Sequence, residues 1–225
     1  MICYLCGKEL QLKEELDDDH IPMRQLYAQQ IRKNHNPNLL TIKTHCLCQK
    51  AYQSDEDYFV STFAVFVSDT YSGSALWSDV KRKLQRQESQ GLRERISGEF
   101  SEASPEGIYL PDGKIYKSYD TNRVNNVIWK ITRGLFFKEY ERFLPVDTPR
   151  KIQCVPPGEE PPKEFMHVRD TLSKATYPGV FDYKFMMIKE INNLHVWAFL
   201  FWDKLISFHY FHDPECQCKI CNKVN

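Results

Sequence analysis

The chain has 225 residues, of which 30 are basic and 30 acidic, so its formal net charge is zero. This length suits one large domain or two small ones, and the charge balance excludes a global basic field that attracts nucleic acid. Any such binding must therefore depend on local patches. The longest apolar run, VWAFLFW, is too short to span a membrane, and MICYLCG at the N-terminus has no signal-peptide pattern. We expect a soluble, cytoplasmic protein without membrane contact.

The first half of the chain is expected to be polar at its start and helical afterwards. Residues 1–50 are polar and contain two clusters of cysteines. Ser54 is followed by acidic residues and then by phenylalanines at helical spacing, which predicts a helix capped by Ser54. Two further helices with basic faces are predicted over residues 76–87 and 92–100.

The second half is expected to combine one long helix with β-structure. Two aromatic and β-branched runs around Pro111-Asp112-Gly113 predict a hairpin over residues 107–119. An apolar stripe predicts a helix over residues 121–144, with Thr121 as its cap. A turn-rich linker is predicted over residues 154–164, and a short helix over residues 163–174. Three successive strands are then predicted over residues 180–190, 195–202 and 204–211.

The cysteines indicate metal binding, because seven of the eight lie in three tight clusters of a cytosolic chain. Cys3 and Cys6 form a CxxCG knuckle, in which two thiolates on a tight turn can bind one zinc ion. In the second cluster, His45 and Cys48 repeat the same spacing. The predicted ligands of this closed, structural zinc site are Cys3, Cys6, Cys48 and either His45, which the spacing favours, or Cys46. Buried structural thiols are the plainer account, but two knuckles that bracket a short segment favour zinc.

The third cluster lies in the C-terminal tail and allows two accounts of equal weight. Its thiols belong to Cys216, Cys218 and Cys221, and His212 stands four residues upstream. Together they could form a second zinc site. An exposed tail with free thiols explains the same residues.

The segment between the two knuckles resembles a known family. In order, the chain contains CxxCG, DHIP, Asn-Leu-Leu and the second knuckle. This order resembles the HNH endonuclease superfamily, the ββα-metal nucleases, and is closest to small bacterial members of the type CxxCG…EHxPP…LTVxxCxxCN…KDEEYF. The corresponding stretches here are CYLCGKEL, DHIP, LTIKTHCLCQ and QSDEDYF. The similarity covers residues 3–59 at the level of motifs and extends more weakly to about residue 202.

The resemblance implies a nuclease site around DHIP. His20 would be the general base that takes a proton from water, and Asp19 would bind a catalytic Mg²⁺ or Mn²⁺. Asn38 would brace the loop that orients the base. Gln49 replaces the family's final His or Asn; its carbonyl oxygen can bind the cation, but glutamine is longer than asparagine and lacks charge. Taken alone, His20 would be read as an exposed loop histidine.

Several other polar residues are candidates for the same site. Arg24, Arg32, Lys33 and Lys50 are the expected phosphate contacts because they lie near the site in sequence. The basic residues of the helices over 76–87 and 92–100 are expected to be solvated faces. His35 is expected to be a polar loop residue, and the acidic run at 55–57 is expected to begin a helix rather than to bind metal.

These observations support two readings of function. The first is a metal-dependent HNH endonuclease that hydrolyses DNA, with RNA not excluded, in phage defence or as a toxin. The second is a decayed HNH zinc module that binds nucleic acid or protein, which Gln49 favours. The neutral charge also favours a regulatory protein partner, and a homodimer is compatible with the sequence.

The expected architecture is α+β. A zinc-stapled ββα unit is expected over residues 1–60, a helical region with a C-terminal antiparallel sheet and a long helix over 61–212, and a cysteine-rich tail over 213–225. The large aromatic residues of the second half are expected in the core: Trp129, Phe136, Phe137, Trp197 and Trp202.

Overall fold

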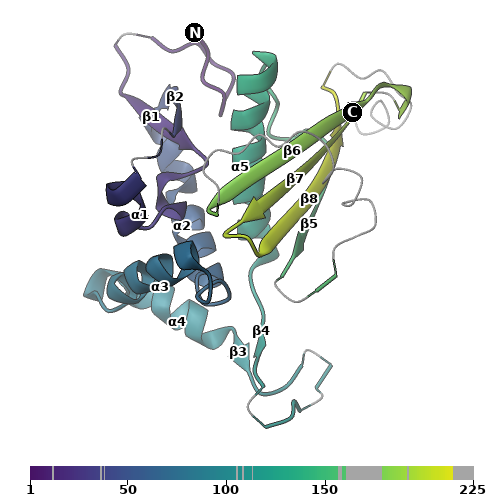
Figure 1. Cartoon of the computed structure of the whole chain (residues 1–225). Helices are drawn as coiled ribbons and strands as arrows, with labels where there is room; N and C mark the ends of the chain where they lie inside the picture. Colours follow the sequence, from purple (N-terminus) through teal and green to yellow (C-terminus); the bar gives the residue numbers. More distant parts are fainter. Residues whose placement is uncertain are drawn as a thin grey trace.

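The computed structural model has an α+β fold (Figure 1). The residues it describes are 1–11, 13–35, 37, 39–104, 106–107, 109–112, 114–156, 159–160, 179–191 and 193–214. The expected helix over residues 163–174 and the cysteines of the tail lie outside these ranges. None of the helices in the described part is long and apolar enough to cross a membrane.

A ββα unit forms the N-terminal part. Strand β1 (Leu16–Ile21) pairs antiparallel with β2 (Leu40–His45), with His20 opposite Thr41. A short 3-10 turn, η1 (Arg24–Leu26), and helix α1 (Gln29–His35) connect the strands. The DHIP element therefore lies on a strand, whose pleat fixes the direction of each side chain.

Helix α2 begins earlier than the sequence suggested. It spans Cys46–Phe63 and follows β2 without a loop, with His45 at its N-cap position. The prediction that Ser54 caps this helix is wrong, because Ser54 lies in the middle of it. Three acidic residues next to it are interior helix residues paired with cations of other helices: Asp55 with Arg123, Glu56 with Lys130 and Asp57 with Lys83. Tertiary pairing, rather than a helix start, explains this acidic run.

The middle of the chain is helical, as expected, with shifted boundaries. Helix α3 (Tyr71–Leu84) begins at the cap Thr70, and α4 (Gln90–Gly98) follows the 3-10 turn η2 (Gln87–Ser89). The predicted hairpin over residues 107–119 is wrong in its pairing. Strand β4 (Tyr116–Lys117) pairs with β3 (Phe100–Ser101), and Tyr109 makes only an isolated bridge to Ala103. A pattern of β-forming residues does not reveal the partner of a short strand.

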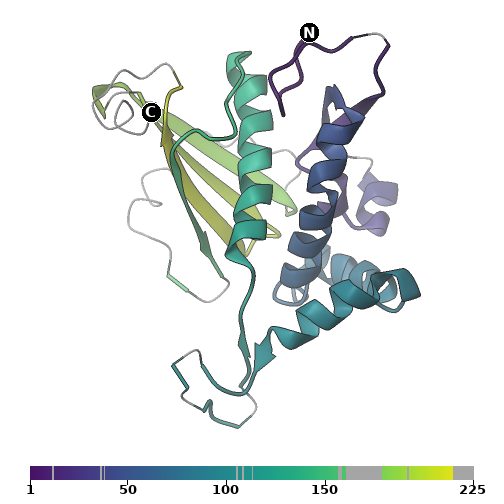
Figure 2. The same ribbon diagram turned by 180° about the vertical axis from the view of Figure 1, so that it is seen from behind.

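Helix α5 (Thr121–Tyr140) is the central element of the molecule. Figures 1 and 2 show it between α2 on one side and the C-terminal sheet on the other. Its cap is Asp120 rather than the expected Thr121, because the Asp120 side chain accepts hydrogen bonds from the backbone N–H groups of Asn122 and Arg123. The carboxylate satisfies two N–H groups that have no partner within the helix.

The C-terminal sheet is antiparallel, with strand order β5-β8-β7-β6. The three predicted strands are confirmed as β6 (Phe181–Ile188), β7 (Leu194–Phe201) and β8 (Leu205–His212). Strand β5 (Arg150–Val155) falls partly in the expected linker and was missed. Four of the five expected core aromatics are buried, and Phe137 is half-buried.

One continuous core joins the two ends of the chain. It includes Cys3 and Tyr4 of the knuckle, Phe59 of α2, Ile128 of α5 and Trp197 of the sheet. The indole of Trp202 donates a hydrogen bond to the carbonyl of Leu26 across this core. The N-terminal unit is thus packed onto the rest of the fold.

Candidate functional site

The CxxCG knuckle is a tight turn held by its own backbone. The N–H of Gly7 donates to the carbonyl of Cys3 at 2.8 Å, and the N–H of Cys3 donates to the carbonyl of Lys8 at 2.9 Å. Gly7 has a φ of 74°, and a Cβ at this position would lie 2.9 Å from the ring of Phe143. Glycine is therefore required here both for the backbone conformation and for space.

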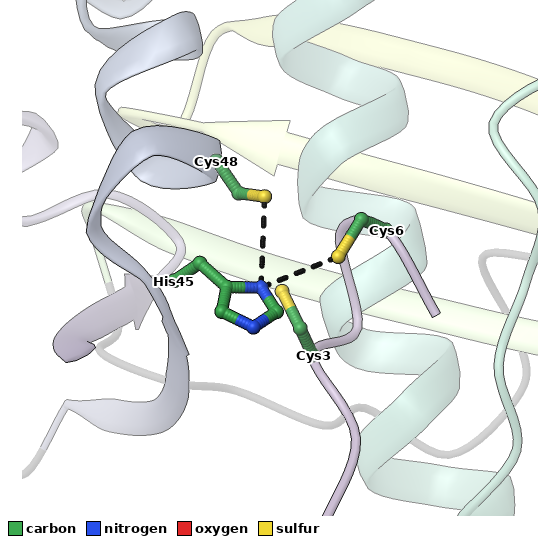
Figure 3. A group of neighbouring side chains, drawn as sticks. All are labelled: Cys3, Cys6, His45 and Cys48. Atoms are coloured by element: carbon green, nitrogen blue, oxygen red, sulfur yellow. Dashed lines mark hydrogen bonds between the residues drawn. The ribbon is translucent and has the colours of Figure 1, made fainter. Parts of the chain in front are cut away.

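The knuckle faces the junction of β2 and α2, where a four-residue cluster forms. The Sγ atoms of Cys3, Cys6 and Cys48 and a ring nitrogen of His45 all lie within 4.8 Å of one another. Figure 3 shows the four side chains pointing toward a common centre, with Nδ1 of His45 directed at Cys6 and Cys48. Three thiols and one imidazole at this spacing could hold a metal such as zinc. His45 rather than Cys46 belongs to this group.

Glu14 completes the surroundings of His45 and was missed in the sequence. Its carboxylate lies 3.0 Å from Nε2 of His45, on the ring edge opposite the thiols. A carboxylate on the distal nitrogen of a ligating histidine fixes the tautomer and the orientation of the ring. Because Glu14 lies outside both knuckles, no spacing rule could have indicated it.

The cluster places three thiols next to one another, and these thiols are difficult to deprotonate without a nearby cation. Burial, together with the neighbouring thiols of Cys6 and Cys3, raises the pKa of Cys48 to about 12. Burial by itself would lower the pKa of His45, but hydrogen bonding to Cys3 and the charge of Glu14 raise it overall. A bound metal ion would lower the pKa of the thiols, since metal binding displaces their protons.

Neighbouring residues of β1 point to opposite faces of the hairpin. Asp19 and Ile21 are buried toward α5, and Ile21 packs against Gly134. Asp18 and His20 lie on the outer face, where Asp18 forms an ion pair with Lys43 at 2.9 Å. The Asp19-His20 pair that the resemblance places in one site is therefore divided between two environments.

Asp19 belongs to a buried ionic network. Its Oδ1 accepts a hydrogen bond from Nζ of Lys130 at 2.8 Å, and its Oδ2 accepts one from the hydroxyl of Tyr4 at 2.5 Å. Lys130 also donates to Glu56, and all four side chains are buried. Burial raises the pKa of Glu56, and the charge of Lys130 opposes this rise. Lys130 is thus the cation that faces both carboxylates.

His20 opens instead into a cavity of about 570 Å³. The cavity is lined by His20, Arg24, Gln29, Arg32, Lys33, Pro37 and Leu39. Burial lowers the pKa of His20, and the nearby positive charge of Arg24 lowers it further. The imidazole is therefore held in its neutral, proton-accepting form at neutral pH.

Three of the expected phosphate contacts line this cavity with His20. Within the described part of the chain, no ion pair involves Arg24, Arg32 or Lys33, and Nε of Arg32 is buried without a hydrogen-bond partner. Burial lowers the pKa of Arg32 and Arg24 contributes to this shift, while the charge of Asp79 on α3 opposes it. Most basic residues of α3, of α4 and of the connection between them behave differently, because they form ion pairs with carboxylates: Arg82, Lys83, Arg86 and Arg95. Unpaired positive charge is thus concentrated at His20.

Other expected site residues do not line the cavity. Gln49 is half-buried on α2, and Lys50 is exposed beside Cys46, whose thiol raises the pKa of the Lys50 amine. Asn38 and the side chain of His35 lie outside what the structure describes. Of the expected site residues, the structure brings the expected base His20 together with three expected phosphate contacts, Arg24, Arg32 and Lys33.

One feature of the sequence could have indicated this surface in advance. Residues 20–54 contain no aspartate or glutamate, although the whole chain is electrically balanced. Five lysines and arginines fall in the same stretch. A global charge count conceals such a block, which is the local signature of a surface for anions.

Comparison with family models, with curated proteins and with solved structures found no match to this chain. We therefore infer the function from the residues of this protein.

Proposed function

We propose that this protein is a nuclease that cleaves phosphodiester bonds in the His20 cavity. The observation that carries the proposal is the presence of His20 and three unpaired cationic side chains around one cavity. A neutral imidazole suits a general base, and clustered arginine and lysine side chains suit the phosphate and the charge that develops on it. The order of motifs, which resembles HNH endonucleases, supports the same reaction class.

In this proposal the Cys3, Cys6, His45 and Cys48 group holds a structural zinc ion. All four positions of a tetrahedral ion would be filled by protein ligands, which leaves no open position for substrate. The ion would connect the knuckle to the start of α2, and β2 would in turn support the strand that carries His20. Zinc would therefore maintain the site without taking part in the reaction.

The test is cleavage and binding of labelled DNA and RNA, single-stranded and duplex, with Mg²⁺, with Mn²⁺ and without an added divalent ion. His20→Ala should abolish cleavage while zinc content and binding persist. Arg24→Gln should weaken binding and reduce the salt slope by about one. Arg86→Gln is the matched control, because Arg86 is exposed, does not line the cavity and faces Glu88.

A binding module without catalysis is the second candidate, and the burial of Asp19 favours it. The carboxylate that would bind a catalytic cation is instead engaged by Lys130 and Tyr4. Under this alternative, Arg24→Gln still weakens binding, but no substrate is cut by the wild type. Absence of both binding and cleavage would overturn both candidates.

A further inference from the structure

None of the described residues that line the His20 cavity carries a carboxylate. Its described side chains are one imidazole, one amide, two apolar groups and three cations. The other residues of this stretch add none, because residues 20–54 contain no aspartate or glutamate. The chemistry of the cavity therefore combines a base with an array of positive charge.

The two nearest carboxylates on the strand are already paired with protein cations. Asp19 faces away from the cavity and is engaged by Lys130 and Tyr4. Asp18 shares the outer face with His20 but pairs with Lys43 and does not line the cavity. Neither carboxylate is directed at the space in which a substrate beside His20 would lie.

These residues do not fit the catalytic Mg²⁺ or Mn²⁺ that the resemblance implies. Hard divalent cations take oxygen ligands and are held in proteins chiefly by carboxylates. A divalent cation in this cavity would lie near the side chains of Arg24, Arg32 and Lys33. Its binding would therefore be opposed by three positive charges. A site of this kind instead favours a substrate that brings negative charge and needs no metal-activated water.

We propose that the substrate of the His20 cavity is RNA, cleaved by attack of its own 2′-hydroxyl without a bound divalent cation. This inference depends on the proposed function, that His20 is the base of a nuclease. RNA meets the requirement because each ribose carries a nucleophile next to the scissile phosphate. DNA lacks that hydroxyl, so hydrolysis of DNA would need an activated water molecule.

The cleavage step needs only His20, the three cations of the cavity, the RNA and water. The neutral ring of His20 takes the proton from the 2′-hydroxyl, and the 2′ oxygen forms a bond to the adjacent phosphorus. The bond from phosphorus to the 5′ oxygen breaks, and the leaving oxygen takes a proton from water. Arg24, Arg32 and Lys33 stabilise the negative charge on the pentavalent phosphorus. The products are a 2′,3′-cyclic phosphate and a 5′-hydroxyl, and His20 returns its proton to solvent.

The test uses the full chain with zinc content verified by elemental analysis, in buffer freed of Mg²⁺ and Mn²⁺ by a chelating resin. A labelled single-stranded RNA is incubated with the protein, and the cleavage position and termini are determined by mass spectrometry. We expect cleavage that leaves a 2′,3′-cyclic phosphate. A single 2′-O-methyl group at the cleaved position, or His20→Ala, should slow the reaction by about 100-fold or more.

Two further arms separate this inference from the proposed function. Asp18→Asn should change RNA cleavage without added metal by no more than a few-fold, because that carboxylate does not line the cavity and acts on His20 only through its charge. Cleavage only after addition of Mg²⁺ or Mn²⁺, on DNA as well as RNA, would overturn the inference and retain the nuclease. A strong loss of activity in Asp18→Asn would also overturn it, since a cation site would then include this carboxylate. No cleavage of any substrate under any condition would overturn both.

Discussion

At the scale of single residues, the direction of a side chain decides whether it belongs to the core or to the site. Asp19 and His20 are neighbours in sequence, yet one is buried in an ionic network and the other opens into a cavity. A motif written as DHIP predicts that both act together. The pleat of β1 separates them, because successive side chains on a strand point to opposite faces.

The sequence predicted the four members of the cysteine-histidine cluster, since knuckle spacing is a local property. It did not predict Glu14, because a carboxylate that orients a ligand can come from any nearby loop. Nor did it indicate that Asp19 faces Lys130, which is 111 residues away along the chain. Contacts between distant segments depend on packing, which no spacing within one motif can specify.

The first prediction concerns Glu14 and the affinity for zinc. Glu14→Gln should weaken zinc binding by about 10- to 100-fold, because the carboxylate that orients His45 is lost. The measurement is competition for zinc against a chromophoric chelator. Glu15→Gln is the matched control, as it removes one negative charge from the adjacent residue. If both variants lose affinity equally, general charge rather than orientation of His45 explains the effect.

At the scale of elements, one face of α5 holds the N-terminal unit in place. Lys130, Arg133 and Gly134 lie on adjacent turns of this helix, at helical spacing. Lys130 faces Asp19, and Gly134 allows the close approach of Ile21. The guanidinium of Arg133 donates to the carbonyls of Tyr4 and Leu5, which lie between the two cysteines of the knuckle. The same helix thus supports both β1 and the proposed zinc site.

The elements that could be predicted are those whose pattern is internal to the element. The long apolar stripe of α5 and the aromatic alternation of β6, β7 and β8 define these elements without a partner. The start of α2 could not be placed, because Ser54 and its acidic neighbours imitate a helix start while their charges pair with other helices. Strand β5 was missed because it is an edge strand next to a proline-rich segment, whose composition indicates a turn.

The second prediction concerns the buried lysine of α5. Lys130→Met should lower the free energy of unfolding by about 3–5 kcal/mol near pH 8, because it leaves two buried carboxylates without a cation. The loss should be smaller at pH 5. Burial already raises the pKa of Glu56, and removal of Lys130 would raise it further. A carboxyl group with a raised pKa in the folded state binds more protons folded than unfolded, so stability falls as pH rises.

Urea unfolding of the variant at the two pH values measures this effect. Lys138→Met is the control, because Lys138 lies at the exposed end of the same helix and pairs with Glu139. Its loss should stay below about 1 kcal/mol. Equal losses for Lys130→Met at pH 5 and pH 8 would contradict a network of ionised carboxylates held by this ammonium group.

At the scale of the whole molecule, the shared core makes the proposed zinc site a property of the entire fold. Cys3 and Tyr4 of the knuckle belong to the same cluster of buried residues as Trp129, Trp197 and Trp202. Because this cluster extends from Cys3 to Phe211, a stabilisation of the knuckle should also stabilise the elements that share the cluster. The third prediction follows from this continuity.

Removal of zinc by a chelator should lower the midpoint of thermal unfolding as detected by the tryptophans, although these residues lie far along the chain from the knuckle. Free zinc at about 100 times its Kd contributes about 2.7 kcal/mol, and each kcal/mol shifts the midpoint of a chain of this size by about 2–4 °C. We therefore expect a fall of about 5–10 °C, measured by tryptophan fluorescence. Cys46→Ser should retain this response to chelator, and Cys48→Ser should lose it, because only Cys48 belongs to the cluster. The contrary result is that the chelator leaves the midpoint of the tryptophan transition unchanged while the N-terminal unit unfolds. This result would mean that the knuckle and the sheet unfold separately, in spite of the core that they share.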